Sequence, residues 1–461
     1  GPITANNPMG VHHAWGRTYK DVWQRFFNMR GFTGRFQNGF DEQGLWVEVE
    51  VEKELGFKNK KDIERYGIDK FVEKCKERVK KFSQIQTEQS KRLAYFMDWD
   101  NSYHTSSDEN NYAIWNFLKV CHKKGYLYKG RDSVPWCPRC GTAISQHEIL
   151  TEEYKEITHK AVFVKYKIIT QNTTFKNHHL LVWTTTPWTL PSNVAIAVNP
   201  NLKYGLWEID KNKLIIEKTR AKALGISIKP KEEFSGRKLV GLNYQGIFDE
   251  LAVLQDVKHK VVAAKDLVTA QEGTGLVHIA PGAGEEDFKL AKEEKLPVVE
   301  SIDESATYIE GFGDLTGKNA KEDPDLIINQ LAEKNALFKV ENYKHRYPTC
   351  WRCKTELVWR VVDEWYIAMD REDPDNTQGL TLREEMVNVA KKINWLPKFG
   401  LDRELDWLKN MHDWLISKKR YWGLALPIWE CTNCRNFVVI GSLHELKEKA
   451  ISGWEKFEGT T

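Results

Sequence analysis

The sequence predicts an α/β domain interrupted by an inserted, mainly-β domain, and three observations lead to this expectation. Long amphipathic segments dominate both ends of the chain. Short runs of β-branched residues, separated by Gly, Pro and Asn, fill the middle from residue 158 to residue 345. At 461 residues the chain exceeds the size at which a single hydrophobic core stops growing, so we expect more than one domain.

These changes in texture divide the chain into segments. We expect a first α/β part at 1–135, a linker with a cysteine pair at 136–157, the β-rich insertion at 158–345, a second cysteine pair and connector at 346–392, and a return to the α/β part at 393–461. Amphipathic periodicity predicts helices over Thr18–Met29, Ile63–Val79, Gln84–Tyr95, Asn110–Lys124 and Leu382–Lys392. The chain has no initiator Met and stops without a capping element, so we treat it as part of a longer protein.

Charge and hydropathy narrow the function classes. The 68 Lys and Arg residues nearly balance the 65 Asp and Glu residues, and the net charge of +3 means that a polyanion must be bound by local patches. No apolar stretch reaches the roughly 18–20 residues that a membrane span needs, and the first residues lack the features of an export signal. We therefore expect a cytoplasmic protein with no membrane partner.

The sequence contains three Cys-x-x-Cys pairs. Two of them flank the β-rich insertion almost symmetrically, namely Cys137 with Cys140 and Cys350 with Cys353. Four thiolates make the closed tetrahedral set of a structural zinc site, and the pairs would converge where the chain enters and leaves the insertion. Reduced thiols without a metal are the alternative. The third pair, Cys431 and Cys434, supplies only two ligands.

The beginning of the chain contains a candidate anion site. Gly and small polar residues precede a helix that we expect to begin near His13, with His12 beside it. A helix N-terminus offers free N–H groups and a positive dipole end, which suit a nucleotide triphosphate. A solvated pair of histidines without a ligand is the alternative that these residues alone leave open.

This stretch resembles the His-x-Gly-His signature loop of the class I aminoacyl-tRNA synthetases, and residues 2–6 resemble the Pro-x-x-Ala-Asn lead-in of their isoleucyl branch. The register puts Gly10, His12 and His13 on the signature positions, with the first His and the Gly exchanged. The exchanged order resembles a minority isoleucyl subgroup associated with resistance to pseudomonic acid. The resemblance implies a Rossmann-type core in which these three residues bind ATP with Mg²⁺, both histidines being catalytic.

Residues 39–71 are similar to the Gly-Trp-Asp-x-His-Gly-Leu-Pro-x-Glu segment of the same branch and the run that follows it. By this resemblance Asp41 holds the α-ammonium group of the amino acid, and Pro2 also contacts the amino acid. A helix N-cap is the alternative role of Asp41. Gln43 and Trp46 stand where the family has His and Pro, which alters the shape of the pocket.

The most distinctive run of the insertion is WTTTPWTLPSN at 183–193. Its threonines offer hydroxyls for a ribose or a water, although threonines in strands are usually only β formers. The run resembles the threonine-rich motif of the editing domain shared by isoleucyl and valyl synthetases, and GTGLVHIAPGAGEEDF at 273–288 resembles the second half of that site. The implied residues are Thr184, Thr185, Thr186 and His278 at the adenosine and the water, Asp287 at the ammonium group, and Trp183 and Asn193 in the pocket wall.

Residues 393–429 resemble the segment that leads back into the Rossmann core, and the family's later synthetic motifs are missing from this chain. The resemblance implies ATP-dependent activation of isoleucine, its transfer to tRNA(Ile), and hydrolysis of mischarged Val-tRNA(Ile) by a monomer. Such editing is needed because one methylene discriminates by only about 1–3 kcal/mol, a magnitude already established for this very pair of amino acids. Two rivals stay open, a valyl enzyme and a zinc-containing tRNA-binding module without catalysis.

Overall fold

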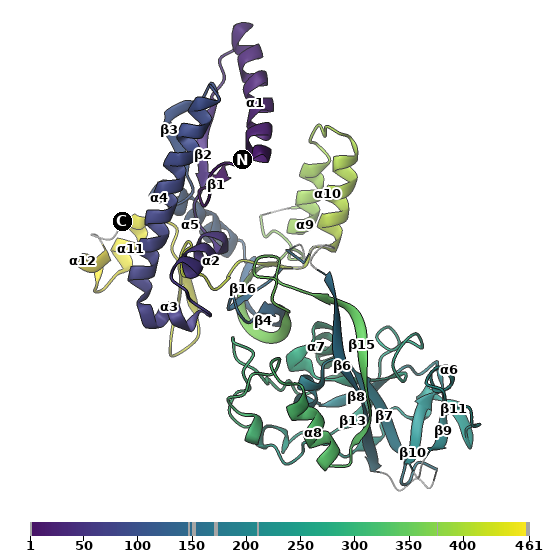
Figure 1. Ribbon diagram of the computed structural model, residues 1–461. Coiled ribbons are helices and arrows are strands. Elements are labelled where there is room, and N and C mark those ends of the chain that lie inside the picture. The colour runs from purple at the N-terminus through teal and green to yellow at the C-terminus, as the bar shows by residue number, and fades with distance from the viewer. Residues whose placement is uncertain are drawn as a thin grey trace. The chain divides into compact units, whose positions relative to one another are not determined.

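The computed structural model divides into two compact units (Figure 1). Unit 1 contains Gly1–Gly130 and Glu364–Thr461, and unit 2 contains Arg131–Asp363. The structure describes residues 2–145, 148–149, 154–169, 174–209, 212–375 and 377–457. Within these ranges no helix is both long enough and apolar enough to cross a membrane. A mainly-β unit thus interrupts an α/β unit, as the texture of the sequence predicts.

The first part of unit 1 is built on a parallel sheet. β1 pairs with β2, placing Thr4 opposite Asp41, and β2 pairs with β3. Parallel strands need a crossover connection, and helices provide it here. In chain order the elements are β1 (Ile3–Thr4), α1 (Val11–Met29), β2 (Gln37–Asp41), α2 (Leu45–Glu54), α3 (Lys61–Tyr66), α4 (Ile68–Arg92), β3 (Asp98–His104) and α5 (Asp108–Lys123).

Two strands carry the chain between the units, β4 (Leu127–Cys137) on the way out and β16 (Val358–Ile367) on the way back. The second part of unit 1 combines helices with long connecting segments and a short antiparallel pair of β18 and β19. Its elements are α9 (Leu382–Ala390), α10 (Phe399–Asn410), β17 (Trp414–Leu415), β18 (Ile428–Glu430), β19 (Phe437–Val439), α11 (Leu443–Lys449) and α12 (Trp454–Phe457).

The expectation of separate helices over Ile63–Val79 and Gln84–Tyr95 is wrong. The helical segment breaks instead at Gly67, whose φ of 107° favours glycine, and α4 then continues without interruption to Arg92. The intervening residues 80–83 begin with two lysines, which are good helix formers, and Ser83 lies on the buried side of α4 with Val79. The polar residues 80–83 therefore lie inside the helix and do not mark its end.

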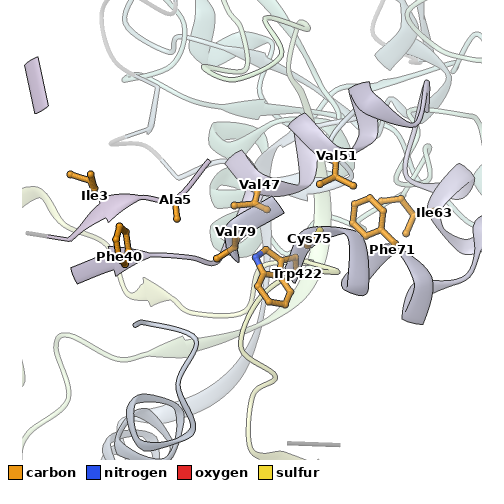
Figure 2. Packing of buried hydrophobic residues seen from close by; sticks show 10 residues of the cluster. All are labelled: Ile3, Ala5, Phe40, Val47, Val51, Ile63, Phe71, Cys75, Val79 and Trp422. Atoms are coloured by element: carbon orange, nitrogen blue, oxygen red, sulfur yellow. The ribbon is translucent and has the colours of Figure 1, made fainter. Parts of the chain in front are cut away.

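The core of unit 1 combines both of its parts. Side chains from the sheet, from α2 to α4 and from the returning segment pack together, and all are at most 9% exposed. Burying each large apolar side chain contributes about 1.5–3 kcal/mol. Figure 2 shows the cluster, which consists of Ile3, Ala5, Phe40, Val47, Val51, Ile63, Phe71, Cys75, Val79 and Trp422.

A buried carboxylate joins the two parts of unit 1. Glu48 on α2 is 0% exposed, and its Oε1 accepts hydrogen bonds from the backbone N–H groups of Tyr421 (2.6 Å) and Trp422 (2.8 Å). The ammonium group of Lys60 pairs with Glu48 and lies 2.6 Å from Glu52, which is also fully buried. Since a buried charge is tolerated only when it is paired and hydrogen-bonded, these contacts keep the returning segment against α2.

Unit 2 contains a large mixed sheet. Within the described residues its strands follow the order β11-β9-β10-β7-β6-β12-β13-β8-β14, and β15 pairs with β6 along most of its length (Figure 1). The strands of this sheet are β6 (Tyr154–Ile169), β7 (His179–Thr184), β8 (Ala195–Val198), β9 (Lys203–Ile209), β10 (Asn212–Glu217), β11 (Glu232–Ser235), β12 (Asn243–Tyr244), β13 (Lys260–Ala263), β14 (Leu276–Ile279) and β15 (Leu337–Pro348). The short strand β5 (Thr142–Ala143) lies outside it and pairs with β4.

Helices of unit 2 are short and lie between the strands in sequence. The α-helices are α6 (Lys218–Ala223), α7 (Glu285–Glu294) and α8 (Asp325–Glu333). Short 3₁₀ helices occupy Pro187–Ser192, Gly236–Lys238, Ala252–Leu254, Pro281–Ala283 and Gly313–Leu315. The turn at Pro187–Ser192 follows β7 and the turn at Pro281–Ala283 follows β14, so two strand ends of the sheet lead into the predicted editing motifs.

Replacing Glu48 by Ala is expected to destabilise unit 1 by about 3–5 kcal/mol, because it leaves two buried amides without an acceptor and one buried cation with fewer partners. Hydrogen exchange of residues 418–424, followed by mass spectrometry, measures the loss of protection. The matched control is Glu77→Ala, since Glu77 is an exposed partner of Lys74 on α4 and its loss should change stability by less than about 1 kcal/mol. Equal effects of the two substitutions would contradict the assigned role of Glu48.

Candidate functional site

The threonine-rich run of unit 2 lies where β7 passes into a 3₁₀ turn. Thr184 ends the strand, and Pro187 fixes the backbone at the first position of the turn. The backbone N–H of Thr186 donates to Thr184 Oγ1 at 3.1 Å, and the hydroxyl oxygens of these two residues are 3.2 Å apart. Thr185 makes no hydrogen bond to a described residue. All three threonines are partly exposed, so their hydroxyls are accessible to a ligand.

His278 on β14 contacts the turn that follows this run. Its ring is 6% exposed; Nε2 lies 2.8 Å from Thr189 Oγ1, and Nδ1 lies 2.9 Å from Asn193 Nδ2. Burial lowers the pKa of His278 to about 3, so the ring is neutral near pH 7. Both ring nitrogens are therefore bonded to protein atoms, and the structure brings His278 and Asn193 together with the threonines through Thr189.

Asp287 lies in the first turn of α7, where the helix dipole favours a carboxylate. The backbone N–H of Ala280 donates to Asp287 Oδ2 at 2.7 Å, which ties the carboxylate to the end of β14. Burial raises the pKa of Asp287 to about 7. No described cation forms an ion pair with Asp287, so this half-buried carboxylate is available to a cationic ligand.

Trp183 and Asn193 differ from the accessible threonines in their surroundings. Trp183 precedes Thr184 on β7, so strand alternation places the two side chains on opposite faces. The Trp183 ring packs edge-on against Tyr343, with ring centres 5.0 Å apart, beside an apolar cluster that includes Leu181. Asn193 is 3% exposed and bonds within the protein.

Sequence reasoning did not single out two residues of this site, Thr189 and Tyr244. Thr189 lies inside the quoted run, and its signal was the spacing, because a hydroxyl residue three positions after Thr186 can bond back to its carbonyl across a turn. Tyr244 comes from the short strand β12 and donates to Asn193 Oδ1 at 2.7 Å. No pattern around Tyr244 in the sequence indicates this contact.

The cysteines of the two flanking pairs converge in unit 2. The sulfur atoms of Cys137, Cys140, Cys350 and Cys353 all lie within 4.8 Å of one another. Both pairs form the same turn, with 2.8 Å hydrogen bonds from Gly141 N–H to Cys137 O and from Lys354 N–H to Cys350 O. Sulfurs around a tetrahedral zinc, bound at about 2.3 Å, are separated by roughly 3.8 Å, so this donor set fits the metal.

The third pair has the same turn but a different setting. Arg435 N–H donates to Cys431 O at 3.0 Å, and both Cys431 and Cys434 are exposed. No other metal-ligating group in the described part of the chain joins them. The pair stays a half-site in the parts that the structure describes.

In unit 1 the predicted nucleotide residues lie at the carboxyl ends of the parallel strands, the edge at which open α/β sheets bind ligands. Gly10 precedes the first turn of α1, and its N–H donates to His13 Nδ1 at 3.2 Å. The rings of His12 and His13 are 3.8 Å apart, and burial together with the charge of His12 lowers the pKa of His13.

The predicted amino-acid residues of unit 1 lie at the same sheet. Asp41 ends β2, and Thr4 Oγ1 donates to its Oδ2 at 3.3 Å. Pro2 is exposed and lies beside Gly39 of β2. Sheet pairing therefore brings the beginning of the chain and Asp41 together.

Comparison with known proteins gives a consistent result. A family model described as tRNA synthetases class I (I, L, M and V) matches residues 1–458. An isoleucine–tRNA ligase of Sulfolobus acidocaldarius is 35% identical over 98% of this chain and 42% of its own length. The corresponding ligase of Methanopyrus kandleri is 39% identical over 98% of this chain and 43% of its own. The chain thus spans less than half the length of these relatives.

Among solved structures, a LeuRS-CP1 chain is matched over 100% of its length and 40% of this chain, with 13% identity and a TM-score of 0.34. A likeness this weak does not identify a family, whereas the family model matches nearly the whole chain.

Proposed function

The chain belongs to the class I tRNA synthetases (I, L, M and V), and on that premise we propose that it forms the activating and editing parts of an isoleucine–tRNA ligase. Unit 1 would bind ATP and isoleucine, and unit 2 would hydrolyse Val-tRNA(Ile). The observation that supports the editing proposal is that, in unit 2, the turn after the threonine hydroxyls bonds to a buried neutral histidine of β14, and the residue after β14 bonds to a carboxylate that has no cationic partner among the described residues.

In the proposed hydrolysis, Asp287 binds the α-ammonium group of the valyl ester. The hydroxyls of the run 184–186 hold the terminal ribose and orient a water, which attacks the ester carbonyl. The ester C–O bond then breaks, valine leaves as the acid, and the ribose oxygen takes up a proton. Hydroxyls and backbone N–H groups stabilise the developing oxyanion. Both nitrogens of His278 are occupied, so we propose that the substrate's own ribose hydroxyl, rather than this ring, activates the water.

We propose that Gly10, His12 and His13 of unit 1 bind the phosphates of ATP at the beginning of α1, with Mg²⁺ held by the phosphates. Asp41, with Pro2 nearby, would hold the ammonium group of isoleucine. The exchanged order of the loop is the proposed basis of resistance to pseudomonic acid. The proposed macromolecular partner is tRNA(Ile), and the protein is proposed to act as a cytoplasmic monomer.

We further propose that Cys137, Cys140, Cys350 and Cys353 hold a structural Zn²⁺, a fit supported by their convergence. Bound zinc cross-links the two turns by metal–thiolate bonds. The two cysteine turns, one near each end of unit 2, bring those ends close together.

The function is tested by release of valine from Val-tRNA(Ile), with Ile-tRNA(Ile) as the substrate that should be spared. Asp287→Asn should lower kcat/KM by about 10- to 150-fold, because a charged hydrogen bond of about 1.5–3 kcal/mol to the ammonium group is lost. The matched control is Glu286→Gln, which removes an exposed carboxylate one residue away and should leave hydrolysis within about twofold. Binding of the tRNA without hydrolysis by the unsubstituted chain would favour the non-catalytic module, and preferential hydrolysis of Thr-tRNA(Val) would favour a valyl enzyme.

The same carboxylate predicts a pH dependence. Its pKa is raised to about 7, so below pH 7 it is mostly protonated and does not attract the ammonium group. We expect kcat/KM for Val-tRNA hydrolysis to fall about tenfold per pH unit below this value and to level off above it. Steady-state rates between pH 5 and 8 measure this, and the inflection should vanish in Asp287→Asn. A flat profile for the unsubstituted chain would rule out this role of Asp287.

Metal analysis of the purified chain is expected to find about one tightly bound Zn²⁺, held by the four converging thiolates. Cys350→Ser should release it, because three thiolates and a hydroxyl bind zinc more weakly. Cys121→Ala is the matched control, since Cys121 is a buried cysteine of unit 1 that packs in an apolar cluster. Retention of zinc in Cys350→Ser would contradict the proposed site.

A further inference from the structure

We propose that Tyr244 is a positioning residue for ester hydrolysis in unit 2, acting through Asn193 and His278 on the threonine-rich run. This inference rests on the proposed editing function. The four side chains from Tyr244 to Thr189 are 2–6% exposed and form one continuous chain of hydrogen bonds, from strand β12 to the turn after β7. The direction of every hydrogen in this chain follows from the chemistry of its two ends.

The orientation of the Asn193 amide is fixed first. One amide atom lies 2.9 Å from the backbone carbonyl of Ala195, which can only accept, so this atom is the nitrogen. Asn193 Oδ1 therefore faces the hydroxyl of Tyr244 at 2.7 Å, and Tyr244 must donate. Tyr244 and the carbonyl of Ala195 together hold the amide in one of its two orientations.

This orientation selects the tautomer of His278. The second hydrogen of Asn193 Nδ2 points at His278 Nδ1, 2.9 Å away, so Nδ1 must accept through its lone pair. The buried ring is neutral, and its one proton therefore resides on Nε2. The hydrogen bond from Asn193 to Nδ1 thus determines that Nε2 carries the proton and acts as a donor.

The Nε2–H group then fixes Thr189. It donates to Thr189 Oγ1 at 2.8 Å, and the hydroxyl of Thr189 donates onward to the carbonyl of Thr186 at 2.8 Å. All hydrogens thus point from Tyr244 toward Thr186, and the carbonyl of Thr186 has its partner. The hydroxyl oxygens of Thr184 and Thr186 lie 3.2 Å apart, and that of Thr186 lies 3.5 Å from Thr189 Oγ1, so the position of Thr189 acts directly on the hydroxyls proposed to hold the substrate.

Loss of the Tyr244 hydroxyl would leave Asn193 Oδ1 buried without its donor. The amide cannot turn over in compensation, because its oxygen would then face the carbonyl of Ala195, so the amide would keep only one of the two contacts that fix its orientation. Its bond to His278 Nδ1 would loosen, and with it the bond from Nε2–H to Thr189, so a change at β12 would reach the threonine-rich run.

Tyr166 on β6 provides a matched control. Its ring packs edge-on against that of Tyr244, with centres 5.3 Å apart, and it is equally buried. Its hydroxyl has no hydrogen-bond partner among the described residues. Tyr166→Phe and Tyr244→Phe therefore remove the same atom from the same layer, and only the second removal breaks the chain.

The experiment compares the full chain with both variants in hydrolysis of Val-tRNA(Ile). Tyr244→Phe is expected to lower kcat about tenfold with KM within about twofold, because the oriented hydroxyls are disturbed while the ammonium site is intact. Tyr166→Phe should match the unsubstituted chain. Unchanged kcat in Tyr244→Phe, or equal losses in both variants, would overturn the proposal.

Nitrogen NMR of ¹⁵N-histidine-labelled protein tests the same proposal without activity, with the His278 signal identified by its loss in His278→Gln. We expect the Nε2–H tautomer in the unsubstituted chain and, only in Tyr244→Phe, an Nδ1 signal moved toward that of a lone pair without a donor. An Nδ1–H tautomer in the unsubstituted chain, or an unmoved Nδ1 signal in Tyr244→Phe, would overturn the proposal. If Val-tRNA is not hydrolysed by any form while the signals follow this pattern, the editing function fails and the positional coupling stands.

Discussion

The contact of Glu48 with the backbone of residues 421–422 is the constraint on which unit 1 depends. The chain leaves this unit after Gly130 and returns at Glu364, so an α/β fold must be completed across a whole inserted unit. Loop-closure entropy grows only slowly with length, but it still has to be offset by contacts between the two parts. Two charge-assisted hydrogen bonds at 2.6 and 2.8 Å and the burial of Trp422 supply such contacts. Both parts of the chain thereby complete the core of unit 1.

Local patterns predicted most of the secondary structure and the broad architecture, because strand texture, helix periodicity and Cys-x-x-Cys spacing are each written within a few residues. The threonine-rich run and the segment with His278 were visible for the same reason. What the sequence could not reveal was long-range polar partnership. Glu48 looked like one acidic residue on an apolar helix, yet it bonds 373 positions away, and Tyr244 bonds to Asn193 from a strand of two residues. Helix interruptions were misjudged where polarity, rather than backbone conformation, was taken as the signal, as at Gly67.

The two candidate sites use different physical means. At the sheet of unit 1, the helix N-terminus with its two histidines suits the anionic nucleotide proposed there, and the carboxylate of Asp41 at a strand end suits the proposed ammonium group. In unit 2, neutral groups predominate: hydroxyls, an amide and an uncharged imidazole bond to one another beside the threonine-rich run, and the carboxylate of Asp287 bonds to the end of β14. Such a site attracts one positive charge through its carboxylate, and its neutral groups select a ligand by shape and by hydrogen bonds. That combination suits an aminoacyl ester, whose ammonium group is its one cation near the reacting bond.

The converging cysteines have a consequence for the evolution of this architecture. Because four sulfurs from both ends of unit 2 lie within 4.8 Å, its entry and exit points are neighbours in space. A gene that gained or lost this unit would need only a short bridge to keep the remaining host fold continuous. The hydrolytic activity proposed for unit 2 could thus be acquired, exchanged or discarded independently of the activity proposed for unit 1.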